Sequence, residues 1–196
     1  MSRYRTRSWR AFDPAPSVSV TAAVSVRILG LDPGSRRTGF GVIDCRGADL
    51  IPVAHDCLNV LSAGPGEARL RRIFEGLQAL CAQHLPAEVA VERVFVSRNP
   101  DSALKLGQAR GAALCALPAG VPVFEYAPRA IKLAVTGSEA AEKFQVAHMI
   151  RTLLSLAERP GADAADALAV AVCHAHARRL AVLAQGAAAQ LSQARR

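Results

Sequence analysis

Three short apolar stretches near the start of the chain alternate with turn-forming residues and predict β-strands. Residues 27–31, 39–43 and 50–60 are rich in Ile, Leu, Val and Phe, and Asp32-Pro33-Gly34-Ser35 separates the first stretch from the second. Runs of this kind, bounded by Pro, Gly and Asp, are typical of strands and turns. Because such short links allow only antiparallel pairing, the three stretches predict an antiparallel meander.

From Glu67 onward the apolar residues recur at helical spacing, which predicts a helix that ends near residues 84–86. A short buried strand is predicted at 89–91, followed by a helix over 99–117 that begins with Asn99-Pro100. The next strand is predicted at 121–126, and its proline indicates an edge position.

The rest of the chain is predicted to be helical, with helices at 128–135, 140–157 and 163–184. The last helix is rich in alanine and other apolar residues, so it is expected to pack largely inside the protein. The second helix is predicted to bury one face, made of Phe144, Ala147, Ile150, Leu154 and Ala157.

This order of elements predicts an α/β fold with a five-stranded mixed sheet, three antiparallel strands first, and helices on both faces. One domain is expected at residues 27–184, because 196 residues suffice for a single core. Residues 1–26 are expected to be a disordered or weakly ordered extension, with a transit peptide or a DNA-touching arm as alternatives. Residues 185–196 are expected to form a weakly ordered tail.

The chain carries a net charge of +8, and the part after residue 24 is basic on its own account. A basic balance favours a polyanionic partner, nucleic acid first and an anionic membrane second. No uninterrupted apolar run reaches the ~18 residues of a membrane span, so no membrane association is expected.

The five cysteines are widely spaced and include no C-x-x-C pair, which favours a reducing compartment, and hence the cytoplasm, over a disulfide framework. Cys173, His174 and His176 superficially resemble a metal cluster. Neighbouring residues on a helix point about 100° apart, so this trio is predicted to converge poorly.

Four acidic residues are the candidate catalytic and metal-binding groups. Asp32 ends the first strand and Glu92 follows the strand at 89–91, so their side chains emerge together if these strands are neighbours. Asp163 and Asp166 share one face of the last helix because they are three residues apart.

Each of these acids also has a purely structural alternative. Asp32 could simply start a turn, and Glu92 could pair with Arg93 or Arg110. Asp163 could cap the helix that follows it.

If the four carboxylates converge, their oxygen atoms suit Mg²⁺, with two ions per site and Mn²⁺ as a substitute, and do not suit zinc. Two ions ~3.5–4 Å apart activate water on one side of a phosphodiester and stabilise the leaving oxygen on the other. The sequence contains no Gly-rich phosphate loop with lysine.

Basic and aromatic residues near these acids are candidate DNA contacts. Arg98, Lys132 and Lys143 are predicted to bind phosphates, with a solvated surface as the alternative. Phe95 lies three residues after Glu92, where it could stack on an unpaired base or belong to the core.

A stripe of small residues on the helix at 99–117 is a candidate contact surface. Gly107 and Gly111, flanked by Leu104, allow the close approach of another element. That element is either the protein's own sheet or a second subunit, and the second alternative predicts a homodimer.

Four segments together resemble the RuvC Holliday junction resolvases: ILGLDPGS at 28–35, VERVF at 91–95, DSALKLGQARG at 101–111 and ADAADALA at 162–169. The resemblance runs from about Arg27 to Arg178. It implies a ribonuclease-H-like fold, a homodimer, and paired nicks in opposed strands of a four-way DNA junction. It also implies a RuvA–RuvB branch-migration complex as partner.

In the same family, the positions that match Asp32, Glu92, Asp163 and Asp166 hold the metals. The positions that match Phe95, Lys132 and Lys143 resemble DNA contacts near the crossover. The segment Gly137–Lys143 departs from the family pattern, because it lacks a second glycine and Glu139 adds negative charge where DNA is expected.

We therefore predict a Mg²⁺-dependent, junction-resolving endonuclease. The alternatives are a related ribonuclease-H-like nuclease for another structured nucleic acid, and a non-catalytic junction-binding protein. A sugar kinase or actin-like ATPase shares a strand–Asp–Gly start, but the sequence lacks the second Asp-Gly-rich hairpin that would bind phosphate.

Overall fold

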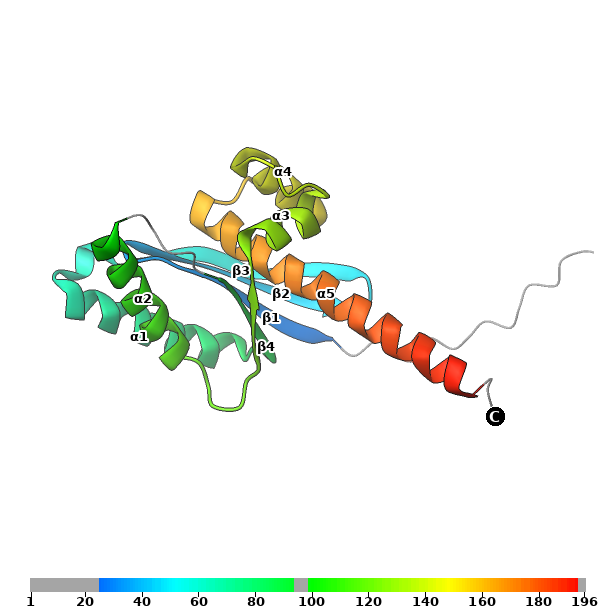
Figure 1. The fold of residues 1–196 in the computed structure, drawn as a ribbon. Helices are drawn as coiled ribbons and strands as arrows, with labels where there is room; N and C mark the ends of the chain where they lie inside the picture. The colour runs from blue at the N-terminus through cyan, green and yellow to red at the C-terminus, as the bar shows by residue number, and fades with distance from the viewer. Residues whose placement is uncertain (1–24, 94–98, 194–196) are drawn as a thin grey trace, which may run out of the picture.

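The computed structural model describes residues 25–93 and 99–193, which form one sheet with helices on both faces (Figure 1). The strands are β1 (Val26–Pro33), β2 (Arg37–Arg46), β3 (Asp49–Asn59), β4 (Glu88–Glu92) and β5 (Val123–Tyr126). The helices are the 3-10 helix η1 (Leu61–Ala63), α1 (Gly66–His84), α2 (Pro100–Cys115), α3 (Pro128–Thr136), α4 (Lys143–Leu153) and α5 (Ala162–Gln193).

The strands lie in the order β3-β2-β1-β4-β5. β1, β2 and β3 pair antiparallel, whereas β4 pairs parallel with both β1 and β5. The predicted five-stranded mixed sheet with three antiparallel strands first is therefore confirmed. β5 lies at an edge, as predicted, but it begins at Val123, so Pro122 precedes the strand.

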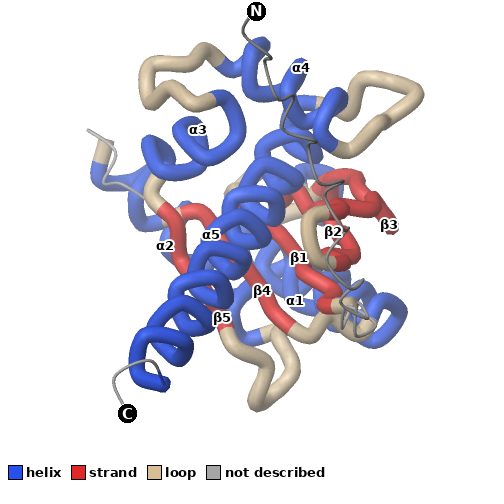
Figure 2. Tube along the Cα trace, turned by 90° about the vertical axis from the view of Figure 1, so that its right-hand side faces the viewer, coloured by secondary structure: helices blue, strands red, loops and turns tan. Residues whose placement is uncertain are grey.

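The two faces of the sheet carry separate apolar cores, because successive side chains of a strand point to opposite faces. Ile28 of β1 packs with Ile150 of α4 and Leu168 of α5, whereas the next residue, Leu29, packs with Ile73 of α1 on the other side. α1 and α2 cover one face, and α3, α4 and α5 cover the other (Figures 1 and 2).

Glycines on the two central strands allow α5 to lie directly on the sheet. Gly30 and Gly41 are paired across β1 and β2. A Cβ on Gly30 would overlap the carbonyl oxygen of Ala167, and one on Gly41 would lie 2.7 Å from Leu168. Because glycine has no side chain, α5 packs directly against the backbone of β1 and β2 at these two positions.

The helix predicted at 140–157 is shorter in the structure, where α4 spans Lys143–Leu153. Gly137 adopts a left-handed conformation at the end of α3, with φ of 76°. Glu142 and Gln145 then form a capping box that starts α4, since each side chain accepts from the other's backbone N–H.

The predicted buried face of this helix is wrong for two of its five residues. Phe144 is 59% exposed and Ala157 lies beyond the helix end, whereas Val146 is buried beside Ala147 and Ile150. In steps of about 100° per residue, Phe144 falls well outside the stripe centred on these three side chains.

α5 continues to Gln193, past the end predicted at 184, so the segment expected to be weakly ordered is helical up to that residue. Its alanine-rich sequence explains the extension, because alanine has the highest helix propensity. The end of α5 projects beyond the sheet (Figure 1). The division of the chain into a domain at 27–184 and two tails remains a prediction, and residues 1–24 lie outside the described ranges.

Contrary to the estimate from uninterrupted apolar runs, residues Ala162–Ala188 of α5 are long and apolar enough to cross a membrane by length and hydropathy. Half of the most apolar window is buried inside the protein. Its apolar residues pack against the sheet, which is how the central core helix of a globular domain is built.

Candidate metal centre

Asp32 and Glu92 lie side by side at one end of the sheet. Leu31 of β1 is paired with Val91 of β4 in parallel register, so the two acids are the next residues of neighbouring strands. Burial raises the pKa of Asp32 to about 6, with Asp166 and Asp163 adding to the shift. Burial, followed by the charges of Asp32 and Asp166, raises the pKa of Glu92 to about 7.

Asp163 and Asp166 reach the same end of the sheet from the first turns of α5. Gly39, the partner of Asp32 across β1 and β2, lies under the start of this helix, and a Cβ there would overlap the carbonyl oxygen of Asp163. The helix begins at Ala162, so Asp163 is inside it and is not its N-cap. The positive end of the helix dipole stabilises both carboxylates.

Two basic side chains lie against this acidic cluster. Lys143 Nζ donates to Asp166 Oδ2 at 2.9 Å, and Arg37 Nη1 donates to Asp163 Oδ2 at 3.4 Å. The hydrogen bond to Asp166 raises the pKa of Lys143. The positive charge of Lys143 in turn lowers the pKa values of Asp32 and Glu92 against the larger effect of burial.

The arginines that could have neutralised Glu92 bind elsewhere. Arg110 donates to the backbone carbonyl of Glu92 at 2.6 Å and to Glu125 Oε1 at 2.5 Å. Arg93 Nε lies 3.8 Å from Glu125 Oε2. Both arginines therefore pair with the Glu125 carboxylate, which leaves the carboxylate of Glu92 facing the other acids.

The chemistry of the cluster suits a hard divalent cation, because all four donors are carboxylate oxygens. Across residues 25–93 and 99–193, however, no three Asp, Glu, His or Cys side chains lie close enough together to share one ion in their present arrangement. The acids interact through their charges, with Lys143 on Asp166 and Arg37 on Asp163. Shared coordination would thus require these side chains to rotate toward one another.

Cys173, His174 and His176 point to separate partners. Cys173 Sγ contacts the carbonyl of Ala130 at 3.8 Å, His176 Nδ1 contacts the carbonyl of Ala134 at 3.1 Å, and the buried His174 bridges Tyr126 and Glu88 at 2.7 Å each. This network ties α5 to α3, β4 and β5, far along the helix from the acids. All five cysteines are free thiols.

Of the four predicted DNA contacts, the structure describes the two lysines. Lys132 lies on α3, close enough to Glu92 to lower its pKa, and Lys143 begins α4. Phe95 and Arg98 lie outside the described residues. Sequence reasoning missed Arg37, whose position four residues after Pro33 gave no indication of its pairing with Asp163 across the fold.

The small-residue stripe on α2 faces away from the sheet. Leu104 is 63% exposed, and within residues 25–93 and 99–193 no atom outside the helix's own backbone lies within 4 Å of a Cβ placed on Gly107 or Gly111. The helix packs inward through Ala109 and Ala113 instead. The alternative that the stripe contacts the protein's own sheet is therefore wrong, and its contact with a second subunit remains a prediction.

Solved structures with the same architecture define the class of protein. A Thermus thermophilus RuvC in complex with a Holliday junction substrate superposes with a TM-score of 0.75 and 35% identity, covering 80% of this chain and 96% of that one. The yeast mitochondrial Holliday junction resolvase Ydc2 shares the fold at a TM-score of 0.58 and 11% identity. The fold, with its acids at the ends of β1 and β4 and the start of α5, is that of the ribonuclease-H-like nucleases.

Sequence comparison specifies the family within that class. The family model described as crossover junction endodeoxyribonuclease RuvC matches residues 28–174. The protein of that name from Alkalilimnicola ehrlichii is 56% identical over 76% of this chain and 91% of its own length. The one from Shewanella amazonensis is 51% identical over 82% of this chain and 93% of its own length. The chain belongs to the RuvC family of crossover junction endodeoxyribonucleases, which are metal-dependent nucleases.

Proposed function

We propose that the chain resolves four-way DNA junctions by paired hydrolytic nicks in opposed strands, with Asp32, Glu92, Asp163 and Asp166 as its catalytic, metal-binding carboxylates. The proposed cofactor is Mg²⁺, two ions per active site, with Mn²⁺ as a substitute. The observation that carries the proposal is the meeting of four acids from three elements at one end of the sheet.

The protein's own residues prepare this site for cations in two ways. Burial beside one another makes Asp32 and Glu92 costly to ionise together, so a divalent cation relieves a repulsion that the fold imposes. Lys143 and Arg37 bind Asp166 and Asp163, the two carboxylates of α5 that would hold cations together with Asp32 and Glu92. When bound, two such ions activate water and stabilise the leaving oxygen of a phosphodiester.

Lys143 has a second role in the proposal, in which its ammonium group exchanges Asp166 for a DNA phosphate. Its side chain contacts Asp166 and is otherwise open to solvent, with 83% of its surface exposed. Once released from Asp166, the ammonium group is free to bind a phosphate of the incoming strand. Lys132, on the neighbouring helix, and Phe95 and Arg98, in the segment after Glu92, are proposed as further DNA contacts.

A homodimer is proposed because a junction with two-fold symmetry presents two equivalent strands to be cut. The exposed stripe of Leu104, Gly107 and Gly111 on α2 is the proposed contact between subunits. Family membership supports a RuvA–RuvB complex as partner, and the free cysteines support a cytoplasmic location.

The proposal is tested by incubating the purified protein with a synthetic mobile four-way junction and with a linear duplex of the same sequence. Symmetric nicking of the junction alone, dependent on Mg²⁺ and abolished by EDTA, is the expected result. Preferential cutting of another structure would favour a related nuclease of different substrate. Tight junction binding without cutting in any divalent cation would favour a non-catalytic junction-binding protein.

A further inference from the structure

Phe144, the second residue of α4, presents its ring to solvent directly beside the acidic cluster. Its neighbour Lys143 contacts Asp166, and adjacent helical residues point about 100° apart. The ring therefore points away from the acids along the surface, and it is 59% exposed. A single exposed aromatic side chain is ordinary on its own, so the neighbours of Phe144 decide what its ring can bind.

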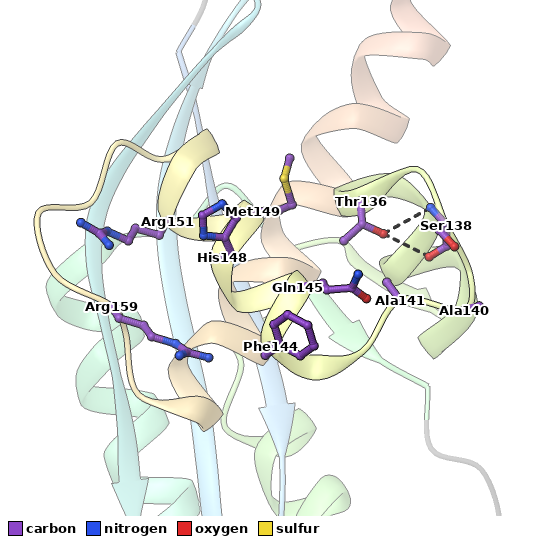
Figure 3. A pocket seen from close by; sticks show the side chains of 10 residues that line it. All are labelled: Thr136, Ser138, Ala140, Ala141, Phe144, Gln145, His148, Met149, Arg151 and Arg159. Atoms are coloured by element: carbon purple, nitrogen blue, oxygen red, sulfur yellow. Dashed lines mark hydrogen bonds between the residues drawn. The ribbon is translucent and has the colours of Figure 1, made fainter.

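Two hollows meet at Phe144. The smaller, of about 380 Å³, is also lined by Lys143 and Asp166 and so opens onto the acidic cluster. The larger, of about 810 Å³, lies between α3 and α4 and is also lined by His148 and Arg151 (Figure 3). Phe144 and Arg159 line both hollows, which makes them the link between the acids and the larger space.

The charged side chains that line the larger hollow are arginines, although Glu139 and Glu158 are sequence neighbours of lining residues. Arg151 and Arg159 line it, and among the described residues no acidic side chain does. Glu142, which lies just before α4, is engaged in the capping box with Gln145. Figure 3 shows Arg159 extending from the α4–α5 connection toward the side of α4 where Phe144 lies, whereas Arg151 points the opposite way.

The two arginines differ in their availability for phosphate. Arg151 donates to the carbonyls of Leu156 and Ala157 at 3.4 Å, so it braces the connection between α4 and α5. Arg159 is exposed, and it forms no hydrogen bond or ion pair with another described residue. Arg159 also lines a third hollow that contains Asp163 and Arg37, so it borders both acidic residues of α5.

We propose that Phe144 and Arg159 form a subsite for one nucleotide of the DNA strand that flanks the scissile phosphate, the ring stacking on its base and the guanidinium binding its phosphate. This inference rests on the proposed function and deepens it. An aromatic face accepts any unpaired base, and an arginine beside it binds phosphate through its planar group. The subsite thereby extends strand binding from the acidic cluster into the larger hollow.

The test uses the full-length protein and four-way junctions in which 5-iododeoxyuridine replaces single nucleotides on either side of the cut, irradiated in EDTA so that no cutting occurs. A cross-link to the peptide that contains Phe144, from one or two adjacent positions, is expected. In Phe144→Leu this cross-link should disappear, and junction affinity should fall about tenfold, whereas Phe144→Trp should retain both. Unchanged melting temperatures show that these variants are folded.

For Arg159→Ala, the slope of log affinity against log salt should fall by about one, while Arg72→Ala, an exposed arginine on α1, should leave it unchanged. Cross-links confined to other peptides, with Phe144→Leu binding as the wild type does, would overturn the subsite. So would a Phe144→Leu protein that sediments differently from the wild type, because the ring would then cover a second copy of the chain.

The outcomes separate this inference from the proposed function. A wild-type protein that cuts junctions without a Phe144 cross-link leaves the function standing and removes the subsite. One that cross-links through Phe144 but never cuts supports the subsite and contradicts the nuclease proposal. A protein that does not bind junctions at all contradicts both.

Discussion

Lys143 and Asp166 join the first residue of α4 to the second turn of α5 through a 2.9 Å contact between Nζ and Oδ2. The same ammonium group lowers the pKa values of Asp32 and Glu92, so it acts on three of the four clustered carboxylates. Lys143 thus lies where a positive charge is needed, whether the neighbouring group is a carboxylate or a phosphate of DNA.

Replacing Lys143 with alanine is predicted to weaken junction binding and to flatten its dependence on salt. Loss of one phosphate contact lowers the slope of log affinity against log salt by about one. Binding in Mg²⁺ over a series of salt concentrations, measured in the non-cutting Asp32→Asn background, reports the slope, and Arg72→Ala on α1 in the same background is the control. An unchanged slope would show that Lys143 touches no phosphate.

The raised pKa values of Asp32 and Glu92 predict how stability depends on pH in the absence of metal. Their ordinary values are 3.8 and 4.5, against about 6 and about 7 in the folded protein. Between those limits the native state binds more protons than the unfolded state, so the free energy of unfolding falls as pH rises from about 4 to about 7.

Asp32→Asn removes the free-energy cost of ionising this buried carboxyl group. The substitution is predicted to increase the free energy of unfolding by about 1–3 kcal/mol at pH 8, with little change near pH 4. Urea unfolding in EDTA across this pH range gives the comparison, with Asp49→Asn, an exposed residue of β3, as the control. Added Mg²⁺ should stabilise the wild type more than Asp32→Asn. A wild type that gains stability as pH rises through this interval contradicts the assignment.

Gly30→Ala is predicted to destabilise the protein by about 1–3 kcal/mol, because the added methyl overlaps the backbone of α5 at Ala167. Gly186→Ala, near the projecting end of the same helix, should cause no loss of stability, because no described atom outside the helix backbone lies within 4 Å of the added Cβ. Chemical unfolding of both variants measures the difference. Equal stability of the two variants would show that the packing of α5 against β1 does not require glycine at position 30.

Leu104→Asp is predicted to shift the protein from dimer to monomer, because a charge in the centre of an apolar contact between subunits is costly. Leu180→Asp is the matched control, since Leu180 on α5 is 68% exposed, close to the 63% of Leu104. Sedimentation velocity of the two variants and the wild type measures the effect. If the dimer persists in Leu104→Asp and dissociates in Leu180→Asp, the contact between subunits lies on α5 and not on α2.

The sheet was predictable because its information is local. Short links force β1, β2 and β3 to pair antiparallel, and the alternation of helices and strands after them sets β4 parallel to β1. From that single pairing it follows that Asp32 and Glu92 lie together. The predicted burial of Phe144 was wrong because the buried stripe of α4 is centred on Val146, Ala147 and Ile150, and the capping box at Glu142 was not recognised.

Contacts between distant residues were not predictable from the sequence. Arg37 and Asp163 are separated by 126 positions, and their pairing depends on how closely α5 approaches β2. The same holds for Glu88, Tyr126 and His174, which form one buried network from three elements. Glu88 and His174 each appear in the sequence as a polar residue between apolar neighbours, and nothing in the sequence indicates that Tyr126 joins them.

The most direct test of the shared cation site is single-turnover cleavage of a four-way junction in Mg²⁺ by Asp32→Asn, Glu92→Gln, Asp163→Asn and Asp166→Asn. Junction affinity is measured in parallel without metal. Each variant is predicted to bind the junction as the wild type does while losing all measurable cutting. Full cutting by any one of them would contradict the claim that these four carboxylates act together on the metal.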